Sequence, residues 1–399
     1  MKKPEILAPA GSIEKLKWAI TYGADAVYIG GQDFSLRANA TNFSLEQIKE
    51  AVEYAHNKNV KVYVTVNIIF HNEDFIGLVE YLKKLEEYKV DAIIIADLSV
   101  VKILKDNNIK LEVHYSTQGS TLNKETVKYL KKLGVERVVL GREVSYEDIL
   151  DIKKNVDIEL ECFIHGAMCT SYSGRCVMSN YFTNRDSNRG GCSQICRWDF
   201  NLYDKENNLH EDDFSFGMSP KDLAMYEYLD KMIEAGITSF KIEGRMRSIY
   251  YIATIVSIYK KTVDRYYLNN SKFVVDDDDL VSLRRCANRE AVVHFFDKEP
   301  TINEQYYNGR REVSNQDFLG VVLDYNKDTK VVTLEQRNYF KKSDEVVFFG
   351  KNTNNIKYTF NKIYDDSNEL IEVVNHPNQV VTFSFEYPLE KDDIMRVSW

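Results

Sequence analysis

The sequence predicts an α/β protein: a (β/α)8 barrel of the TIM type with a cysteine-bearing insertion, followed by a small all-β, barrel-like domain. Three observations lead to this prediction. Over the first 245 residues, short apolar runs alternate with amphipathic helical stretches. One interval between apolar runs is far longer than the others and holds four of the six cysteines. From about residue 317, the hydrophobic period changes to two, as in antiparallel strands.

The apolar runs are short and rich in valine and isoleucine, which is typical of parallel strands buried on both faces. They span residues 5–10, 26–30, 61–67, 92–97, 111–118, 137–142, 158–164 and 239–245. Helical stretches lie between them, and several end in Gly or Asn, a normal helix stop. Eight such units favour a closed barrel over a doubly wound sheet, which is the second choice.

The same pattern divides the chain into three parts. Residues 1–268 are expected to form the barrel, with the insertion at about 166–220, between the seventh and eighth strands. Residues 269–316 include four consecutive aspartates and are expected to be a solvated connecting segment. Residues 317–399 are expected to form the β domain. Loops as long as this insertion are usually functional.

The sequence is expected to be that of a cytoplasmic protein without membrane spans, because its amino-terminal apolar run is too short for a secretory signal. Hydrophobic residues make up 44% of the 399 residues and charged residues 28%, and no apolar run reaches spanning length. Cytoplasmic thiols stay reduced, so clustered cysteines indicate metal binding or catalysis rather than disulfides. The net charge of −9 argues against a generally basic nucleic-acid coat, but it leaves room for a local positive groove.

Polar residues follow the predicted strands, at the rim where such barrels carry their active sites. The residues of interest are Gln118, Arg142, His165, Glu243 and Arg245. Arginines at this rim suit an anionic ligand, and neighbouring glycines let a ligand approach the backbone. Each residue alone is equally compatible with a turn or a cap. Together they predict a pocket at the rim.

The cysteines of the insertion give the most specific signal. Their spacing is C-x6-C-x15-C-x3-C, in a loop of small polar residues, and they are Cys169, Cys176, Cys192 and Cys196. Four thiolates suit either zinc or an iron–sulfur cluster, and the spacing does not decide between the two. His165 precedes this set and suits ligation, proton transfer or simple orientation of the loop. Cys162 and Cys286 are expected to pack in the interior.

Peptidase and nucleic-acid signals are weaker. The sequence has neither an H-E-x-x-H nor a G-x-S-x-G motif, and a Cys–His pair that meets only in the fold stays open. The helix after the last barrel strand carries arginines and lysines among five tyrosines, and residues 336–342 form a second basic, aromatic patch. Such residues suit RNA. For the helix alone, an ordinary barrel helix with one solvated and one packing face is favoured.

Residues 161–179 resemble the signature of the collagenase-like peptidases, peptidase family U32. The matching motif is E-x-F-x2-G-A-M-C-x4-G-x-C-x-M-S, and the resemblance continues through residues 7–31, 190–198 and 219–248. The β region at the end resembles the accessory C-terminal domain of this family. Despite its name, the family resembles a group of oxygen-independent hydroxylases that act on transfer RNA, ribosomal RNA or the ubiquinone ring.

The resemblance is greatest to the branch that hydroxylates transfer RNA. It implies conversion of the wobble uridine to 5-hydroxyuridine, with a 4Fe-4S cluster as cofactor, prephenate as co-substrate and the anticodon region of tRNA as partner. A protein partner subunit is left open, because a chain with a net charge of −9 gains from help in binding RNA. The alternative is a peptidase, and the alternative metal is zinc.

The resemblance also implies residue roles. The four cysteines of the insertion would be the cluster ligands, and Cys196 becomes necessary because Ala224 stands where some relatives have a cysteine. The substrate-binding candidates, of which the arginines would hold the carboxylates of prephenate, are Arg37, Gln118, Arg142 and Arg245. The candidates for proton transfer are Glu243 and His165.

Overall fold

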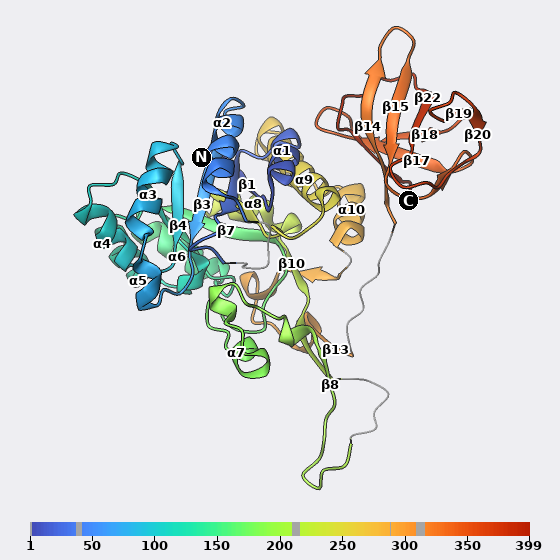
Figure 1. Ribbon diagram of the computed structural model, residues 1–399. Helices are drawn as coiled ribbons and strands as arrows, with labels where there is room; N and C mark the ends of the chain where they lie inside the picture. The colour runs from blue at the N-terminus through green and yellow to red at the C-terminus, as the bar shows by residue number, and fades with distance from the viewer. Residues whose placement is uncertain (1, 37–41, 210–215, 288, 309–315) are drawn as a thin grey trace.

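The computed structural model describes residues 2–36, 42–209, 216–287, 289–308 and 316–399 (Figure 1). It confirms the predicted barrel, because β11 pairs in parallel with both β1 and β7 and so closes a sheet of eight parallel strands. Each strand overlaps one predicted run. The strands are β1 (Glu5–Pro9), β2 (Ala26–Gly30), β3 (Lys61–Val66), β4 (Ala92–Ile95), β5 (Glu112–Tyr115), β6 (Arg137–Val139), β7 (Glu159–Gly166) and β11 (Ser239–Ile242).

Helices connect the strands and pack around the barrel. They are α1 (Ile13–Thr21), α2 (Leu45–His56), α3 (Leu78–Glu87), α4 (Ser99–Asp106), α5 (Lys124–Leu133), α6 (Tyr146–Asn155), α8 (Leu229–Glu234) and α9 (Ile249–Leu268). Several begin at a serine whose hydroxyl accepts a backbone N–H, as Ser12 does from Lys15 at 3.2 Å. Among the described helices, none combines the length and apolar character that crossing a bilayer requires.

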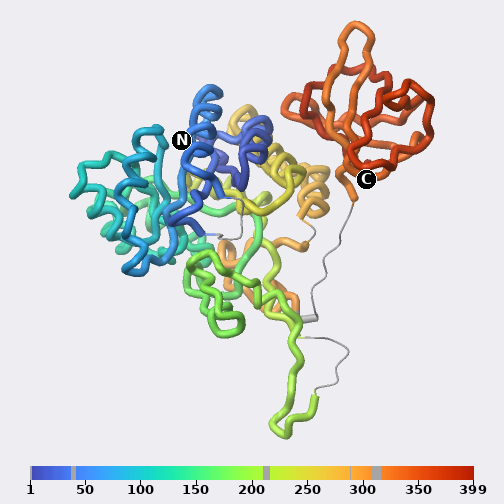
Figure 2. The backbone as a smooth tube through the Cα atoms, in the orientation of Figure 1, coloured from blue at the N-terminus to red at the C-terminus, as the bar shows by residue number. Residues whose placement is uncertain are grey.

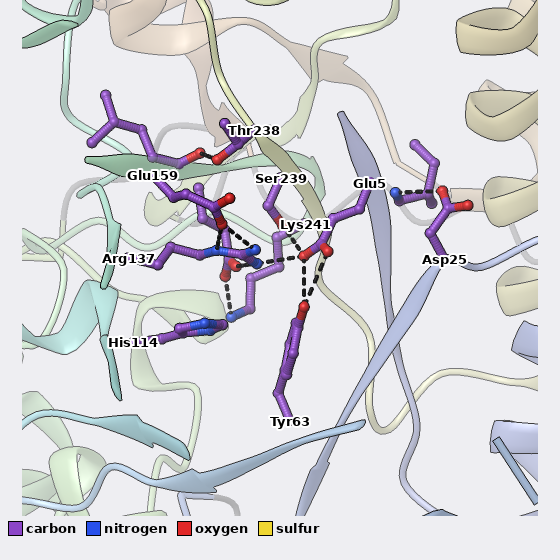
Figure 3. A network of polar contacts seen from close by, with 12 residues as sticks. Glu5, Asp25, Tyr63, His114, Arg137, Glu159, Thr238, Ser239 and Lys241 are labelled. Carbon is purple, nitrogen blue, oxygen red and sulfur yellow. Dashed lines mark hydrogen bonds and ion pairs between the residues drawn. The ribbon is translucent and has the colours of Figure 1, made fainter. Parts of the chain in front are cut away.

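The barrel interior is filled differently along its axis. A small apolar cluster that includes Leu7, Tyr28 and Ile94 lines part of it. Near the amino-terminal ends of the strands, a buried network of charged residues takes over (Figure 3). Arg137 lies at its centre and contacts carboxylates from β1 and β7. The barrel therefore has a charged floor beneath its mouth.

The insertion between β7 and β11 begins with three short helical segments and continues into a projecting arm that carries an antiparallel pair of strands (Figure 1). Its elements are α7 (Met178–Thr183), η3 (Ser187–Arg189), η4 (Ile195–Arg197), β8 (Asp199–Phe200), β9 (Phe216–Pro220), β10 (Asp222–Ala224) and η5 (Tyr226–Tyr228). β10 pairs antiparallel with β7, which extends the barrel sheet by one strand.

The segment expected as a solvated connection is more ordered than the sequence suggested. Its elements are α10 (Asp277–Ala287), β12 (Ala291–Val292), η6 (His294–Phe296), η7 (Ile302–Glu304) and β13 (Gln305–Asn308). The run of aspartates forms the first turn of α10, where carboxylates stabilise the helix dipole. β12 and β13 pair with β10 and β9, so this segment returns to the insertion.

The predicted all-β domain is confirmed as an antiparallel sheet of eight strands with its own apolar core. Its backbone is the orange and red part of the tube in Figure 2. Its strands, including the separate pair β16–β21, are β14 (Phe318–Asn326), β15 (Val331–Gln336), β16 (Phe340–Lys341), β17 (Glu345–Phe349), β18 (Ile356–Thr359), β19 (Ile363–Tyr364), β20 (Leu370–Ile371), β21 (Val373–Val374), β22 (Val380–Ser384) and β23 (Ile394–Val397). The domain docks on the barrel through Phe349, which packs against Tyr22 and Tyr250, and through the paired side chains of Arg285 and Asp317.

Candidate functional site

The insertion lies across the mouth of the barrel, where the loops after the strands meet. After β3, the backbone N–H of Ile69 donates to the carbonyl of Asn188 at 3.1 Å. Near the same loop, Arg189 pairs with Asp74, with Nη2 donating to Oδ1 at 2.9 Å. This pairing lowers the pKa of Asp74 to about 2, chiefly through the hydrogen bond from Arg189. The insertion is therefore fixed to the rim on the β3 side.

Two further loops hold the first half of the insertion. Gly174 lies so close to the backbone of Gln118, after β5, that a Cβ at this position would collide with it. Its φ of +72° also favours glycine. After β6, Glu143 accepts hydrogen bonds from the backbone N–H and the hydroxyl of Ser173, the former at 2.8 Å. These contacts place the segment from Cys169 to Cys176 over the barrel mouth.

The four cysteines of the insertion share one neighbourhood. Burial raises the pKa of the Cys196 thiol, Arg197 opposes this, and the negative charges of the other three cysteines raise it further. Cys169 is exposed, and the other three members are half-buried. Within the described part of the chain, no three His, Cys, Asp or Glu side chains converge closely enough to hold a single metal ion. The thiols are thus electrostatic neighbours without sharing one coordination sphere.

Positive charge is buried beside these thiols. Arg197 donates to the carbonyl of Met168 at 2.7 Å. Burial lowers the pKa of the Arg197 guanidinium, and the negative charges of Cys196 and Cys169 partly oppose this effect. Three guanidiniums share the buried carboxylate of Asp222, at 4.0, 3.5 and 3.3 Å, and they belong to Arg197, Arg247 and Arg289. Guanidinium groups beside the cysteines suit an anionic group at this place.

Two of the predicted arginines lie at the mouth. The guanidinium of Arg142 stacks 3.9 Å from the ring centroid of Phe163 and donates to the carbonyl of Ala167. Arg245 enters from the loop after β11 and is buried, with Nη1 at 3.2 Å from the hydroxyl of Ser35. A Cβ on Gly30 would collide with this guanidinium, so the glycine makes its position available.

Gln118 and Glu243 also lie at the rim. The Oε1 atom of Gln118 is buried and has no hydrogen-bond partner among the described residues, which leaves an acceptor available to a ligand N–H. Glu243 is half-buried at the end of β11, and its backbone N–H donates to the carbonyl of His165 at 2.9 Å. Gly166, with a φ of +118°, packs directly against it.

His165 lies behind the sheet rather than in the mouth. Its side chain is only 1% exposed, and Nδ1 lies 3.1 Å from the hydroxyl of Tyr259 on α9. Burial lowers the pKa of His165 to about 3, and the charge of Arg247 adds to this effect. A shift in the β7–β11 register between Lys241 and Ile242 coincides with this placement. The imidazole of His165 is therefore neutral, and only the backbone of this residue lies close to the rim.

The remaining sequence-based expectations have mixed outcomes. Arg37 lies outside the described residues. Cys162 and Cys286 pack in the interior as expected, and burial raises the pKa of both thiols, that of Cys286 to about 12.

A cavity of about 580 Å³ lies between α9, α10 and the β domain, away from the predicted rim pocket. Its lining includes Lys261 and Arg396.

Sequence reasoning missed Asp222 as a functional residue. This side chain stands inside the P-K-D-L stretch that contributed to the family resemblance, so a signal was present. Its arginine partners come from three separate segments of the chain. Such a long-range cluster has no local sequence pattern.

Two family models match consecutive parts of the chain: "Peptidase family U32" over residues 11–306 and "Peptidase family U32 C-terminal domain" over residues 314–396. The chain is 48% identical to tRNA hydroxylation protein P1 of Bacillus subtilis, over 99% of this chain and 95% of that protein. It is 30% identical to tRNA hydroxylation protein P of Haemophilus influenzae, over 93% and 90% of the two chains. It is also 36% identical to a protein of Porphyromonas gingivalis named collagenase, over 66% of each chain.

Proposed function

Because the chain belongs to peptidase family U32, we propose that it is an enzyme that hydroxylates transfer RNA. The observation that carries this proposal is its similarity, over nearly the full length of both chains, to a tRNA hydroxylation protein. In finer detail, we propose an oxygen-independent conversion of the wobble uridine to 5-hydroxyuridine that depends on an iron–sulfur cluster and prephenate.

The cysteines fit a cluster better than their spacing alone suggested. Each thiolate of a four-iron cluster binds a different iron, so the ligands need to share a neighbourhood rather than one coordination sphere. The proposal takes Cys196 as the fourth ligand, and the influence of Cys169, Cys176 and Cys192 on the pKa of its thiol supports this choice. When bound, the cluster would supply electron transfer that no side chain at the mouth offers.

Side chains at the mouth would bind and orient the substrates. Arg142 and Arg245 suit the two carboxylates of prephenate, because guanidinium groups bind carboxylates in a bidentate manner. The buried Oε1 of Gln118 suits the N3–H donor of a uracil ring. Stacking on Phe163 holds the guanidinium of Arg142 in place while the substrates bind.

Of the two candidates for proton transfer, Glu243 is better placed. Its side chain is half-buried at the rim, where a substrate proton is within reach. The neutral His165 would act as a positioning residue, since its carbonyl accepts the backbone N–H of Glu243 and its ring is held by Tyr259.

Anaerobic purification tests the cofactor assignment. We expect a brown protein with about four irons and four acid-labile sulfides per chain. A colourless protein with stoichiometric zinc would contradict this assignment. Nucleoside analysis of tRNA incubated with the reconstituted enzyme, with and without prephenate, then tests the reaction. Formation of 5-hydroxyuridine without prephenate would remove the co-substrate from the proposal.

A peptidase is the second candidate, because the chain resembles a protein named collagenase. Incubation of the same anaerobic preparation with gelatin and denatured collagen distinguishes the two functions. Cleavage that survives removal of the metal and also mutation of the cysteines would favour the peptidase. If no preparation cleaves either substrate, the hydroxylase remains as the single candidate function.

A further inference from the structure

Large aromatic side chains are exposed around the four cysteines. Tyr172 follows Cys169 by three residues, Trp198 follows Cys196 by two, and α7 carries Tyr181 and Phe182. Tyr181 is 85% exposed and Trp198 is 45% exposed. Clusters of exposed apolar side chains on a folded surface mark binding sites. We call these four aromatic residues, together with Arg175 and Arg185, the insertion face.

The insertion face stands on an ordered scaffold. The backbone N–H of Ser193 donates to the hydroxyl of Ser179 at 3.0 Å, and the hydroxyls of Thr183 and Ser193 lie 2.9 Å apart. These contacts join α7 to the segment that carries Cys192. The ring of Phe182 meets that of Phe200 edge to face, with centroids 6.0 Å apart. The aromatic side chains are thus presented by packed elements next to the cysteines.

The charge of this region favours an anionic partner. Residues 169–198 contain four arginines and one aspartate, although the whole chain has a net charge of −9. Arg189 pairs with Asp74, and Arg197 lies beside Asp222. Within the described residues, neither of the other two arginines pairs with a carboxylate. Burial raises the pKa of Tyr115, which ends β5, and the charge of Arg175 partly opposes this effect. Arg175 therefore lies near the barrel mouth.

The two patches that the sequence suggested for RNA are less suitable. On α9, the tyrosines are largely buried, and Arg265 is paired with Asp276 and Asp279. In residues 336–342, Arg337 pairs with Glu335, and Lys342 pairs with Glu372. Figure 1 also shows the β domain on the opposite side of the molecule from α7. The insertion face is the candidate that combines exposed rings, uncompensated cations and closeness to the cysteines.

We propose that the insertion face is the platform on which unpaired bases of an RNA loop stack while one base is delivered to the barrel mouth. This inference rests on the proposed function. Aromatic rings accept any base by stacking, and the two arginines suit the phosphates between stacked bases. The platform binds single-stranded RNA because bases within a duplex do not expose their faces.

Fluorescence anisotropy with a labelled anticodon stem-loop RNA, at constant salt, tests the platform without requiring catalysis. Tyr181→Ala and Trp198→Ala are each expected to weaken binding by about 5- to 100-fold. Tyr181→Phe and Trp198→Phe are expected to retain most of the affinity, because they keep a ring. Replacing Arg175 and Arg185 together by glutamine is expected to reduce the slope of log K against log salt concentration by about 0.7 for each charge removed.

Matched controls are exposed tyrosines elsewhere on the chain. Tyr129→Ala on α5 and Tyr339→Ala in the patch 336–342 remove rings that are 57% and 52% exposed, and both are expected to leave affinity within about twofold. An effect of Tyr339→Ala alone would move the RNA site to the β domain and overturn the proposal. Unchanged RNA affinity in Tyr181→Ala, together with loss of self-association, would assign the face to a protein contact and also overturn it.

The outcomes separate this inference from the proposed function. Hydroxylation by the wild type, with unchanged binding and activity in the platform variants, would remove the platform and keep the function. RNA binding that depends on the platform, without any hydroxylation by the reconstituted protein, would keep the platform and remove the function. Failure of the wild-type protein to bind RNA would remove both.

Discussion

Replacing Glu161 by glutamine tests the charged floor of the barrel (Figure 3). Glu161 is fully buried on β7, with Oε1 at 2.7 Å from Nζ of Lys241 and Oε2 at 3.2 Å from Nη1 of Arg137. Burial alone would raise the pKa of Glu161, but these two cations lower it to about 2. The carboxylate is therefore ionised in the folded protein throughout the physiological range.

The expected loss of stability follows from this geometry. The ordinary pKa of glutamate is about 4.3, and a unit of pKa corresponds to about 1.4 kcal/mol, so the native state favours the charged form of Glu161 by about 3 kcal/mol. Among the described residues, Glu161 is the only carboxylate within ion-pair distance of Lys241. Glu161→Gln leaves this ammonium buried and unpaired, which raises the expected cost to about 3–5 kcal/mol.

A double-mutant cycle in urea measures this effect. With a slope of about 3 kcal/mol per M, Glu161→Gln should lower the midpoint of barrel unfolding by about 1–1.7 M. Lys241→Met should cost less, because Glu161 keeps Arg137. The double variant should be more stable than the sum of the single effects predicts, with a coupling of about 1–3 kcal/mol.

Glu159→Gln is the matched control, because Glu159 also contacts Arg137 but is partly exposed. We expect it to cost no more than about 1 kcal/mol. A change below about 0.5 kcal/mol in Glu161→Gln, or simple additivity in the double variant, would refute the reasoning. Either result would mean that water or local rearrangement compensates the unpaired ammonium.

Three further predictions concern the same structure. The lowered pKa of Glu161 contributes stability that is complete above pH 4.3 and lost as the pH falls towards about 2, so urea midpoints should drop over this window more steeply in the wild type than in Glu161→Gln. Arg189→Ala should remove the pairing with Asp74 and increase proteolysis of the insertion, while barrel stability changes by no more than about 1 kcal/mol; equal proteolysis would contradict the tether. In metal-free native protein, iodoacetamide should label the exposed Cys169 and spare the buried Cys162, whose thiol pKa is raised by burial, as mass spectrometry of peptides would show.

Elements buried on both faces were predictable from sequence. Runs such as 92–97 contain almost only apolar residues, because both sides of a parallel barrel strand are covered. The turn of α10 was harder to predict. Consecutive aspartates resemble a solvated loop, and they form a helix here because Asp276 accepts the backbone N–H groups of Asp278 and Asp279 at the helix start.

The site was predictable only in part. Rim positions such as Arg142 and Gln118 follow from where strands end, a local property of the sequence. The direction of His165 coincides with a register shift between β7 and β11, and the environment of Asp222 depends on segments far apart in the chain. Both features arise when distant segments meet, so no window of the sequence contains them.

The most direct test of the account is the 5-hydroxyuridine content of tRNA from a strain that lacks this modification and expresses the chain or its variants. We predict that the wild type and Cys162→Ala restore the modified nucleoside, because Cys162 only packs in the interior. Cys196→Ala should restore none, although the protein accumulates normally. Full restoration by Cys196→Ala would contradict the claim that the four cysteines of the insertion act together at the barrel mouth.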